Sequence, residues 1–351
     1  MVWGEAILSL LTAFLIALVS YPVYIKVAIY KRLFDAPDKE RKIHEKHIPS
    51  MGGIIMFAAT LISFFFWYPI DDIHITRFLI PSVIILVFIG IKDDIIGTSA
   101  LYKLSAQIFV ALLMTLAADV RITGFHGLFG IREIPEYLSV LFTVFTFIVI
   151  INSFNLIDGI DGLAGGIGFN TAFWMGVWFV LAGNNLMSVL AFALSGSILA
   201  FLIFNMQPAK VFMGDTGSLF IGLLMAVLSI VLIEYDKDLL PHYMKTLSKP
   251  LLGMAMLSYP LFDTLRVFFI RIMKGRSPFL PDRNHIHHLW IDLGKSHKQA
   301  TFILVFSNIF IVMVTVLATY FLESLPAFLL SFGTTFLVYL WPWFLKEKSK
   351  K

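Results

Sequence analysis

The chain has 351 residues, of which 58% are hydrophobic and 14% are charged. This apolar excess is more than a water-soluble domain of ordinary size can bury, so the composition excludes a soluble globular protein. The absence of cysteine excludes a disulfide framework and a thiolate metal site. The formal net charge of +4 becomes informative only when the charges are placed along the chain.

Long uncharged stretches recur along the whole chain, and we expect each of them to form a transmembrane helix. Nine of them occupy residues 7–25, 51–70, 78–91, 104–118, 137–157, 216–233, 250–262, 299–322 and 324–345. The stretch 162–209 is too long for one crossing, and the turn signal Gly183-Asn184-Asn185 divides it into two. The sequence therefore predicts an all-α integral membrane protein with about eleven transmembrane helices, organised as a single polytopic membrane domain over residues 1–351.

The positions of Lys and Arg predict the orientation of this domain, because both residue types are retained on the cytoplasmic side. The loops after the odd-numbered spans, together with the C-terminal tail, carry 20 of them, whereas the opposite loops carry six. We therefore expect the N-terminus outside, the C-terminus in the cytoplasm, and a multi-pass location in the plasma membrane. The catalytic loops on the cytoplasmic side would then be approximately 26–50, 92–103, 152–166, 205–218 and 271–298.

Polar clusters gather in these cytoplasmic loops, and we expect them to form one active site. The first combines Lys46, an expected substrate-binding residue, with the glycine-rich run 49–53. The second is Asp93-Asp94, which directly follows an apolar stretch. Two adjacent carboxylates at a membrane surface need a compensating cation or proton. The alternative for this pair is a solvated helix end.

The third cluster places amides and carboxylates at three-residue intervals, which would put them on one face of a helical segment. Its members are Asn152, Asn155, Asp158 and Asp161. Glycines interrupt that segment at 159 and 162, and a relaxed backbone beside carboxylates suits phosphate and a hard cation such as Mg²⁺. A calcium-type structural loop or a plain turn is the alternative.

The fourth and fifth clusters also carry groups that suit anions and metal ions. Asp215 lies between glycines directly before an apolar span, where a helix N-terminus favours phosphate and a carboxylate favours a metal ion. A simple helix-capping role is the alternative for Asp215. The run 282–288 offers three histidines and Arg283, which fit phosphate binding or acid–base chemistry better than zinc. A solvated polar loop is the alternative here.

Carboxylates, glycine-rich turns and basic side chains on one face of a lipid-embedded bundle favour phosphoryl transfer to a membrane-bound acceptor. The ordered motifs at 47–53, 93–94, 152–166, 211–218 and 285–288 resemble those of the polyprenyl-phosphate N-acetylhexosamine-1-phosphate transferases. This family includes undecaprenyl-phosphate GlcNAc-1-phosphate transferases and the phospho-MurNAc-pentapeptide translocase. The resemblance covers nearly the whole chain. It implies an eleven-helix enzyme that condenses a UDP-N-acetylhexosamine with undecaprenyl phosphate, releases UMP and starts cell-envelope polysaccharide synthesis.

The resemblance also implies roles for individual carboxylates. Asp215 matches the family's Mg²⁺-binding aspartate, with Mn²⁺ as an alternative ion, and we expect Asp158 to share the metal. Asp93 and Asp94 match the paired aspartates near the catalytic phosphates, with Asp93 as the expected base for the lipid phosphate. Asp158 and Asp161 match active-site positions that line the nucleotide and the metal.

Substrate binding is implied for a second group of residues, which carry amide or basic side chains. They are Asn152, Asn155, Asn205, Arg283, His285 and His288. Asn205 matches an asparagine on the uridine side, and His287 is expected to be catalytic within the histidine motif. No nucleic-acid partner is expected, and family likeness suggests a homodimer.

Two departures from the family pattern refine these expectations. Many relatives continue the paired aspartates into Asp-Asp-x-x-Asp, but this chain has Gly97 at the third position, which weakens any mechanism that needs a third carboxylate there. The histidine motif reads His-Ile-His-His, as in the simple amino-sugar branch, so we favour UDP-GlcNAc over the translocase-like alternative. We expect the lipid phosphate to attack the donor directly; the alternative is that an aspartate attacks first and carries a covalent phospho-sugar.

An ion-coupled membrane transporter is the alternative from another class, because intramembrane carboxylates also mark ion pathways. A transporter would need ionisable groups at mid-bilayer depth. In this chain the charged residues gather toward one face, and the expected spans are nearly free of charge.

Overall fold

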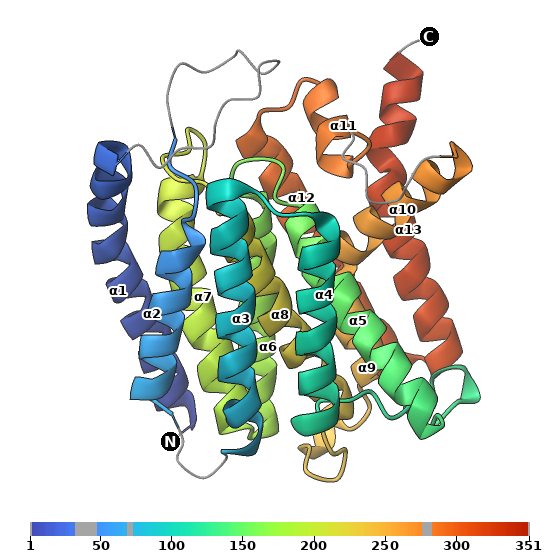
Figure 1. Cartoon of the computed structure of the whole chain (residues 1–351). Helices are drawn as coiled ribbons and strands as arrows, with labels where there is room; N and C mark the ends of the chain where they lie inside the picture. Colours follow the sequence, from blue (N-terminus) through green and yellow to red (C-terminus); the bar gives the residue numbers. More distant parts are fainter. Residues whose placement is uncertain (1, 32–47, 69–72, 276–282, 350–351) are drawn as a thin grey trace.

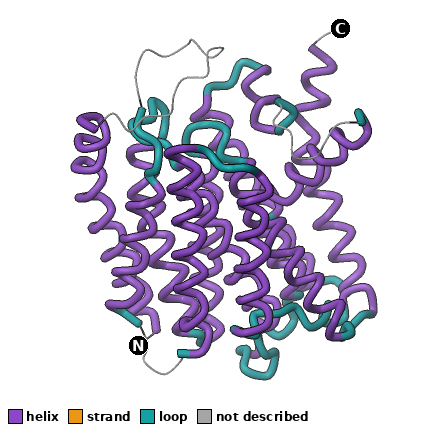
Figure 2. The backbone as a smooth tube through the Cα atoms, in the orientation of Figure 1, coloured by secondary structure: helices purple, strands orange, loops and turns teal. Residues whose placement is uncertain are grey.

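The computed structural model describes residues 2–31, 48–68, 73–275 and 283–349. Helices and loops account for these residues, and no β-strand occurs among them (Figure 2). The all-α prediction is therefore confirmed for the described part of the chain. The long helices run roughly side by side in one bundle (Figure 1).

The helices follow one another with mostly short connections. In chain order they are α1 Val2–Lys31, α2 Gly53–Phe66, α3 His74–Ile96, α4 Ala100–Leu112, α5 Glu136–Leu156, α6 Leu163–Ala182, α7 Asn185–Asn205, α8 Gly214–Glu234, α9 Lys249–Met256, α10 Ser258–Met273, α11 Ile286–Asp292, α12 His297–Phe321 and α13 Ser324–Ser349. A π-helical turn, Leu113–Ala117, extends α4. Short 3-10 turns occur at Leu128–Gly130 and His242–Met244.

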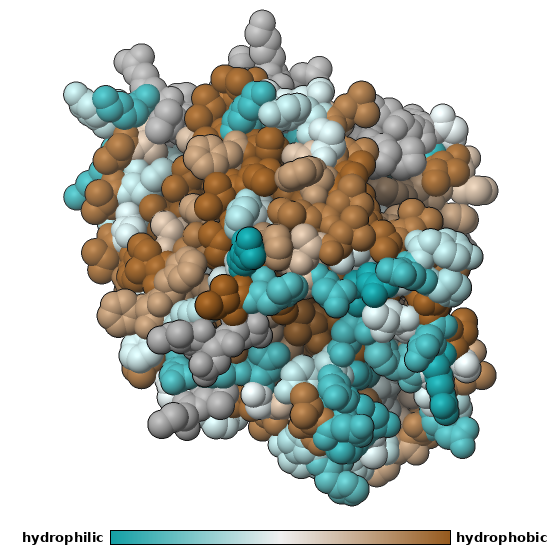
Figure 3. Space-filling view, turned by 60° about the horizontal axis from the view of Figure 1, so that its bottom comes forward, coloured by the Kyte–Doolittle hydropathy of each residue, from teal (hydrophilic) through white to brown (hydrophobic). Residues whose placement is uncertain are grey.

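Within the described residues, nine helices are long and apolar enough to cross a membrane. The bent pair α9 and α10 would make a tenth span, whereas α2 has only 14 residues. These helices fit a multi-pass membrane protein, and hydrophobic residues cover much of the side surface in Figure 3. The count of eleven crossings and the outside position of the N-terminus stay predictions.

The predicted division of the stretch 162–209 is confirmed. Gly183 ends α6 with a φ of 82°, in the left-handed region that glycine adopts easily. The side chain of Asn184 then caps α7 by accepting a hydrogen bond from the backbone N–H of Met187 at 3.0 Å. The turn signal therefore lies where the chain reverses direction.

Burial differs strongly between the helices and identifies the centre of the bundle. In the apolar stretch of each helix, 89% is buried for α8, against 28% for α1 and 17% for α13. Helices α3 and α5 pack against α8. The first turn of α8 is therefore held by helices around it, which makes it a rigid platform for Asp215.

The predicted span 250–262 is broken in the structure. Helices α9 and α10 meet at Leu257 with a bend of 73°. Asn308 on α12 donates to the carbonyls of Ala255 and Met256 at 3.2 and 3.3 Å, and Thr171 on α6 donates to Met256 at 3.0 Å. These side chains satisfy carbonyls that the break leaves without helical partners, which allows a bend inside the bundle. Pro260, three residues after Leu257, lacks the backbone N–H that would pair with the carbonyl of Met256, so the sequence carries a signal for this break that the predicted span did not use.

Candidate active site

Glycines allow α2 and α3 to approach the first turn of α8 very closely. A Cβ added to Gly53 would lie 2.1 Å from the backbone nitrogen of Gly217, and one added to Gly90 would lie 2.4 Å from the Cα of Thr216. Any side chain at either position would force the helices apart. Gly53 and Gly90 therefore bring the ends of α2, α3 and α8 together around Asp215.

Backbone hydrogen bonds tie the same motif to the segment before α8. Gly52 donates to the carbonyl of Phe212 at 2.9 Å, and Gly53 donates to the carbonyl of Met213 at 3.1 Å. In the other direction, Phe212 donates to the carbonyl of Pro49 at 2.8 Å. The run 49–53 thus braces the entrance to α8. Lys46, the substrate-binding residue predicted in this loop, lies outside the described residues.

Asp94 on α3 caps the N-terminus of α8. Its Oδ1 accepts from the backbone N–H of Asp215 at 2.8 Å, and its Oδ2 accepts from the backbone N–H and hydroxyl of Thr216 at 3.1 and 2.6 Å. These are N–H groups that the first turn of a helix leaves without a partner. Asp94 therefore fixes where Asp215 lies, and its predicted catalytic role stays a prediction.

Asp93, one residue earlier, is held by donors from the turn that follows α3. Gly97 ends this helix with a φ of 72°, and Thr98 donates from its backbone N–H and its hydroxyl to Asp93 Oδ1 at 2.8 and 2.6 Å. The second oxygen of Asp93 accepts from Lys103 Nζ at 2.7 Å. The departure from the family pattern at Gly97 therefore falls on a turn that requires glycine-like geometry.

Asp215 shares the same lysine. Lys103 Nζ lies 2.5 Å from Asp215 Oδ2, so one ammonium bridges carboxylates from α3 and α8. The other oxygen of Asp215 accepts from Asn155 Nδ2 at 2.9 Å, and the same amide donates to Ser218 Oγ at 2.9 Å. The side chain of Asp215 therefore points to its neighbours instead of capping α8, so the simple capping alternative does not describe it.

Lys103 is a site residue that the sequence reasoning missed. It lies on the first turn of α4, after the N-cap Ser99, whose side chain accepts from the backbone of Tyr102. The paired aspartates had predicted a compensating positive charge. Because helices α3 and α4 are joined by a tight turn, a lysine ten residues after Asp93 can reach back to it, and this spacing was the available signal.

Asp158 and Asp161 line a polar cavity of about 270 Å³ beside this cluster. Asn205 and Gly214 contribute to the same wall. Burial raises the pKa of Asp158 to about 7, with further contributions from the negative charges of Asp215, Asp94 and Asp161. The cavity is therefore lined by excess negative charge, which a cation or a proton must offset before an anionic substrate can enter.

Two of the predicted substrate-binding amides are engaged in internal hydrogen bonds. Asn205 accepts from the backbone N–H of Gly162 at 2.8 Å and donates to the carbonyl of Val211 at 2.9 Å, so it links the loops that flank the cavity. Asn152 donates to Gln107 Oε1 on α4 at 2.6 Å. These contacts position loops and helices, while substrate contacts by Asn152 and Asn205 stay predictions.

The histidine motif packs against the loop that carries Asp158. The rings of His285 and His287 stack with centroids 5.3 Å apart, and those of His287 and His288 lie 4.3 Å apart. A Cβ added to Gly159 would lie 2.6 Å from His287 Nε2. The histidine motif of the fifth predicted cluster therefore contacts the loop that carries Asp158, which belongs to the third. Arg283, in the same cluster as the histidines, is exposed.

Burial determines the protonation state of His287. It lowers the pKa of this imidazole to about 3, and the pKa of His288 is also lowered by burial first and then by nearby positive charge. His287 is therefore neutral at physiological pH. In this state it serves as a hydrogen-bonding group more readily than as a proton donor, and its predicted catalytic role remains a prediction.

The donor set around Lys103 Nζ suits a divalent cation. Mg²⁺ is usually held by one or two carboxylates, with water and substrate phosphates completing the shell. Asp93 and Asp215 already converge on one cationic atom. Among the described residues, no three acidic or imidazole groups form a complete ligand set. Binding of Mg²⁺ beside Asp215 stays a prediction.

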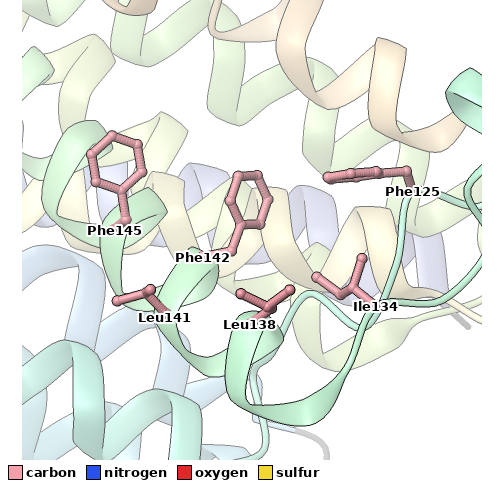
Figure 4. A pocket seen from close by; sticks show the side chains of 6 residues that line it. All are labelled: Phe125, Ile134, Leu138, Leu141, Phe142 and Phe145. Atoms are coloured by element: carbon pink, nitrogen blue, oxygen red, sulfur yellow. The ribbon is translucent and has the colours of Figure 1, made fainter.

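A second cavity, of about 530 Å³, has different chemistry. It is lined by Phe125 and Ile134 of the loop before α5 and by apolar residues of α5 itself (Figure 4). Its walls offer almost no hydrogen-bonding partner for a phosphate or a sugar. The polar cavity beside Asp158, although smaller, is therefore the one suited to phosphoryl chemistry.

Comparisons with known proteins identify the family of this chain. The Glycosyl transferase family 4 matches residues 76–233. The probable undecaprenyl-phosphate N-acetylglucosaminyl 1-phosphate transferase of Bacillus subtilis (strain 168) is 30% identical over 308 residues, covering 86% of this chain and 82% of the relative. The undecaprenyl-phosphate alpha-N-acetylglucosaminyl 1-phosphate transferase of Salmonella typhi is 32% identical over 327 residues, covering 90% and 84%. The transferase of the same name from Haemophilus influenzae is 30% identical over 340 residues, covering 95% and 93%.

Three observations together define the class of this protein as a membrane-embedded phosphotransferase. They are the apolar helical bundle, the carboxylate cluster at the ends of its helices and the sequence similarity to these relatives. The resemblance seen in the five motifs is confirmed. The chain belongs to glycosyl transferase family 4, together with the undecaprenyl-phosphate N-acetylglucosaminyl 1-phosphate transferases.

Proposed function

We propose that this protein transfers GlcNAc-1-phosphate from UDP-GlcNAc to undecaprenyl phosphate at the cytoplasmic face of the plasma membrane. An oxygen of the lipid phosphate attacks the β-phosphorus of the donor, the bond from that phosphorus to the bridging oxygen breaks, and UMP leaves with that oxygen. The product is a lipid-pyrophosphate-sugar. The names of the relatives and the polar cavity beside an apolar bundle support this proposal.

One observation carries the proposal most strongly. Asp93 from α3 and Asp215 from α8 converge on a single cationic atom, 2.7 and 2.5 Å away, at the end of a lipid-facing bundle. The reaction brings two anions together, so it needs concentrated positive charge at one point. A transporter would have no need to gather carboxylates from separate helices around a cation at one end of the bundle.

Asp215 and Asp158 would hold Mg²⁺, or Mn²⁺ in its place. Bound there, the ion would neutralise phosphate charge during transfer. Asn155 orients Asp215, and Asp94 fixes the backbone that carries it. Asp93 remains our proposed base, and it becomes free to take a proton once Lys103 no longer contacts it.

Several finer features belong to the same proposal. The orientation with the N-terminus outside places these groups in the cytoplasm, where UDP-sugars are available. Asn205 lies on the cavity wall, where it would border the uridine, and His285 and His288 would border the sugar phosphate. Family likeness also suggests that two copies associate as a homodimer.

A donor panel tests the proposal. Purified protein would receive undecaprenyl phosphate, Mg²⁺ and one of UDP-GlcNAc, UDP-GalNAc or UDP-MurNAc-pentapeptide, and UMP and lipid-linked sugar would be measured. We expect both products only with UDP-GlcNAc. Preference for the pentapeptide donor would favour the translocase-like alternative. Uptake of the UDP-sugar into vesicles without formation of either product would favour the transporter.

A further inference from the structure

Asp263 on α10 is a buried carboxylate outside every motif considered so far. Its exposed fraction is 0%, and it lies beyond the bend that separates α9 from α10. A carboxylate removed from water to this extent is strongly destabilising unless charge-bearing or N–H partners surround it. Its partners therefore reveal why the bundle tolerates it.

Both oxygens of Asp263 accept from the histidine loop. Oδ2 lies 2.7 Å from His285 Nδ1, and Oδ1 accepts from the backbone N–H of Ile286 at 2.8 Å. An ionised carboxylate can only accept, so the shared proton of the first contact resides on His285 Nδ1. This leaves Nε2 as the nitrogen of His285 that is free to interact with another group.

The contacts of Asp263 extend to the polar cavity through the stacked rings. His285 stacks on His287 with an angle of 11° between the ring planes. His287 Nδ1 lies 3.4 Å from the hydroxyl of Tyr259, which is also on α10. His287 Nε2 is buried and has no hydrogen-bond partner among the described residues, and it faces Gly159. An unpartnered nitrogen at this place points toward the loop of Asp158 and Asp161.

We propose that Asp263 is a positioning residue for the histidine motif. It fixes the Nδ1-protonated tautomer of His285 and anchors the start of α11, and it thereby sets where His287 Nε2 meets the Asp158 loop. The bend at Leu257 serves this arrangement, because it directs α10 toward the histidine loop. This inference rests on the proposed function, since it assigns the histidine motif to the same site.

Substitutions at Asp263 separate positioning from packing. Asp263→Asn keeps the volume and can still accept from Ile286, but its amide would donate to His285 Nδ1 and favour the other tautomer. Asp263→Glu keeps the carboxylate but adds a methylene to a fully buried position. We expect Asn to lower the turnover number by about 100-fold or more, as when the carboxylate behind a catalytic imidazole becomes an amide. Glu should recover at least part of that loss.

A merely structural role predicts the opposite order, because the larger Glu would disturb the packing more than the isosteric Asn. Asp238→Asn is a matched control, since its side chain is 97% exposed in a loop far along the chain from the site motifs. It should retain wild-type turnover and thermal stability. Equal losses in Asn and Glu, or a greater loss in Glu, would overturn the inference.

A spectroscopic measurement tests the same inference without any substrate. In ¹⁵N-histidine-labelled protein in lipid nanodiscs, the wild type should show one imidazole locked with its proton on Nδ1, and Asp263→Asn should lose that signal. His285→Gln identifies the signal by removing it. Retention of the signal in Asp263→Asn contradicts the inference. If the wild type fails to use UDP-GlcNAc but the signal behaves as expected, the proposed function fails while the positioning by Asp263 stands.

Discussion

The two ends of α8 carry acidic residues in opposite circumstances. At the C-terminal end of α8, Glu234 accepts three hydrogen bonds from one loop. Thr123 donates from its backbone N–H and its hydroxyl at 2.9 and 2.6 Å, and His126 donates at 3.1 Å. At the N-terminal end, Asp93 and Asp94 of α3 lie beside Asp215 of α8. Lys103 bridges Asp93 and Asp215.

The difference lies in the balance of charge. Glu234 is one carboxylate with donors on all sides, so its contacts complete themselves and tie the loop to the bundle. The start of α8 has three carboxylates beside one ammonium, and Asp158 adds a fourth carboxylate nearby. Such a surplus is destabilising unless a further cation or a proton binds. The contacts of Glu234 are therefore complete, whereas the carboxylates at the start of α8 keep negative charge that a cation or a proton can offset.

Replacement of Asp215 should lower turnover more than any other change at either end of α8. Asp215→Asn removes the carboxylate that meets Asp93 at the cation position, so we expect turnover to fall by about 10³-fold or more. Glu234→Gln is the matched control at the other end of the same helix. It should keep turnover within a few-fold of wild type while lowering the melting temperature. UMP release and thermal unfolding of both variants provide the measurements.

Replacement of Lys103 should sharpen the assignment of the cation position. Lys103→Met leaves Asp93 and Asp215 without their shared cation, so the melting temperature without metal should fall and added Mg²⁺ should restore more of it than in wild type. We expect turnover to fall by about 100-fold, in line with the loss of one charged group in a transition-state site. A melting temperature in Lys103→Met that does not respond to Mg²⁺ would contradict a shared metal position.

Replacement of Asp94 tests its capping role. Asp94→Asn presents an amide whose nitrogen cannot accept from the Thr216 backbone, so part of the cap on α8 is lost. We expect a loss of about 1 kcal/mol in the free energy of unfolding. Turnover should fall less than in Asp215→Asn. An effect on turnover equal to that of Asp215→Asn, with unchanged stability, would instead favour a direct catalytic role.

The pH dependence of stability should show the raised pKa of Asp158. In the folded protein without metal this pKa is about 7, whereas in the unfolded chain it is near the ordinary value. Between these values the folded state binds a proton that the unfolded state has released, so stability falls as pH rises from about 4 to 7. Asp158→Asn should flatten this slope in melting temperatures measured without Mg²⁺. An unchanged slope would assign the pH dependence to other groups.

The sequence was informative wherever the signal is local. Apolar length predicted the long helices, and a glycine with two asparagines predicted the turn between α6 and α7, because both depend on neighbouring residues. The motifs at 49–53, 93–94 and 211–218 meet around Asp215, and the histidine motif contacts Gly159 in the loop of Asp158. The break at Leu257 has a local signal in Pro260, but Asn308 and Thr171, whose side chains satisfy the carbonyls at the break, lie far away in the chain.

The same distinction applies to the site. Lys103 and Asp263 were not predicted because neither belongs to a motif and their roles depend on contacts with other helices and loops. Asn152 and Asn205 make hydrogen bonds to neighbouring helices and loops, which the sequence did not indicate, and their predicted contact with substrate stays a prediction. Residue type and spacing predict which chemistry is present, whereas the division between binding and positioning depends on three-dimensional contacts.

The central claim is that carboxylates from α3 and α8 form one cation-dependent transfer site, and one assay tests it directly. Wild type, Asp215→Asn and Glu234→Gln would each receive UDP-GlcNAc and undecaprenyl phosphate, with and without Mg²⁺, while lipid-linked GlcNAc is quantified. We predict product from wild type and Glu234→Gln only when Mg²⁺ is present, and almost none from Asp215→Asn. Full turnover by Asp215→Asn, or product formation by wild type without a divalent ion, would contradict the claim.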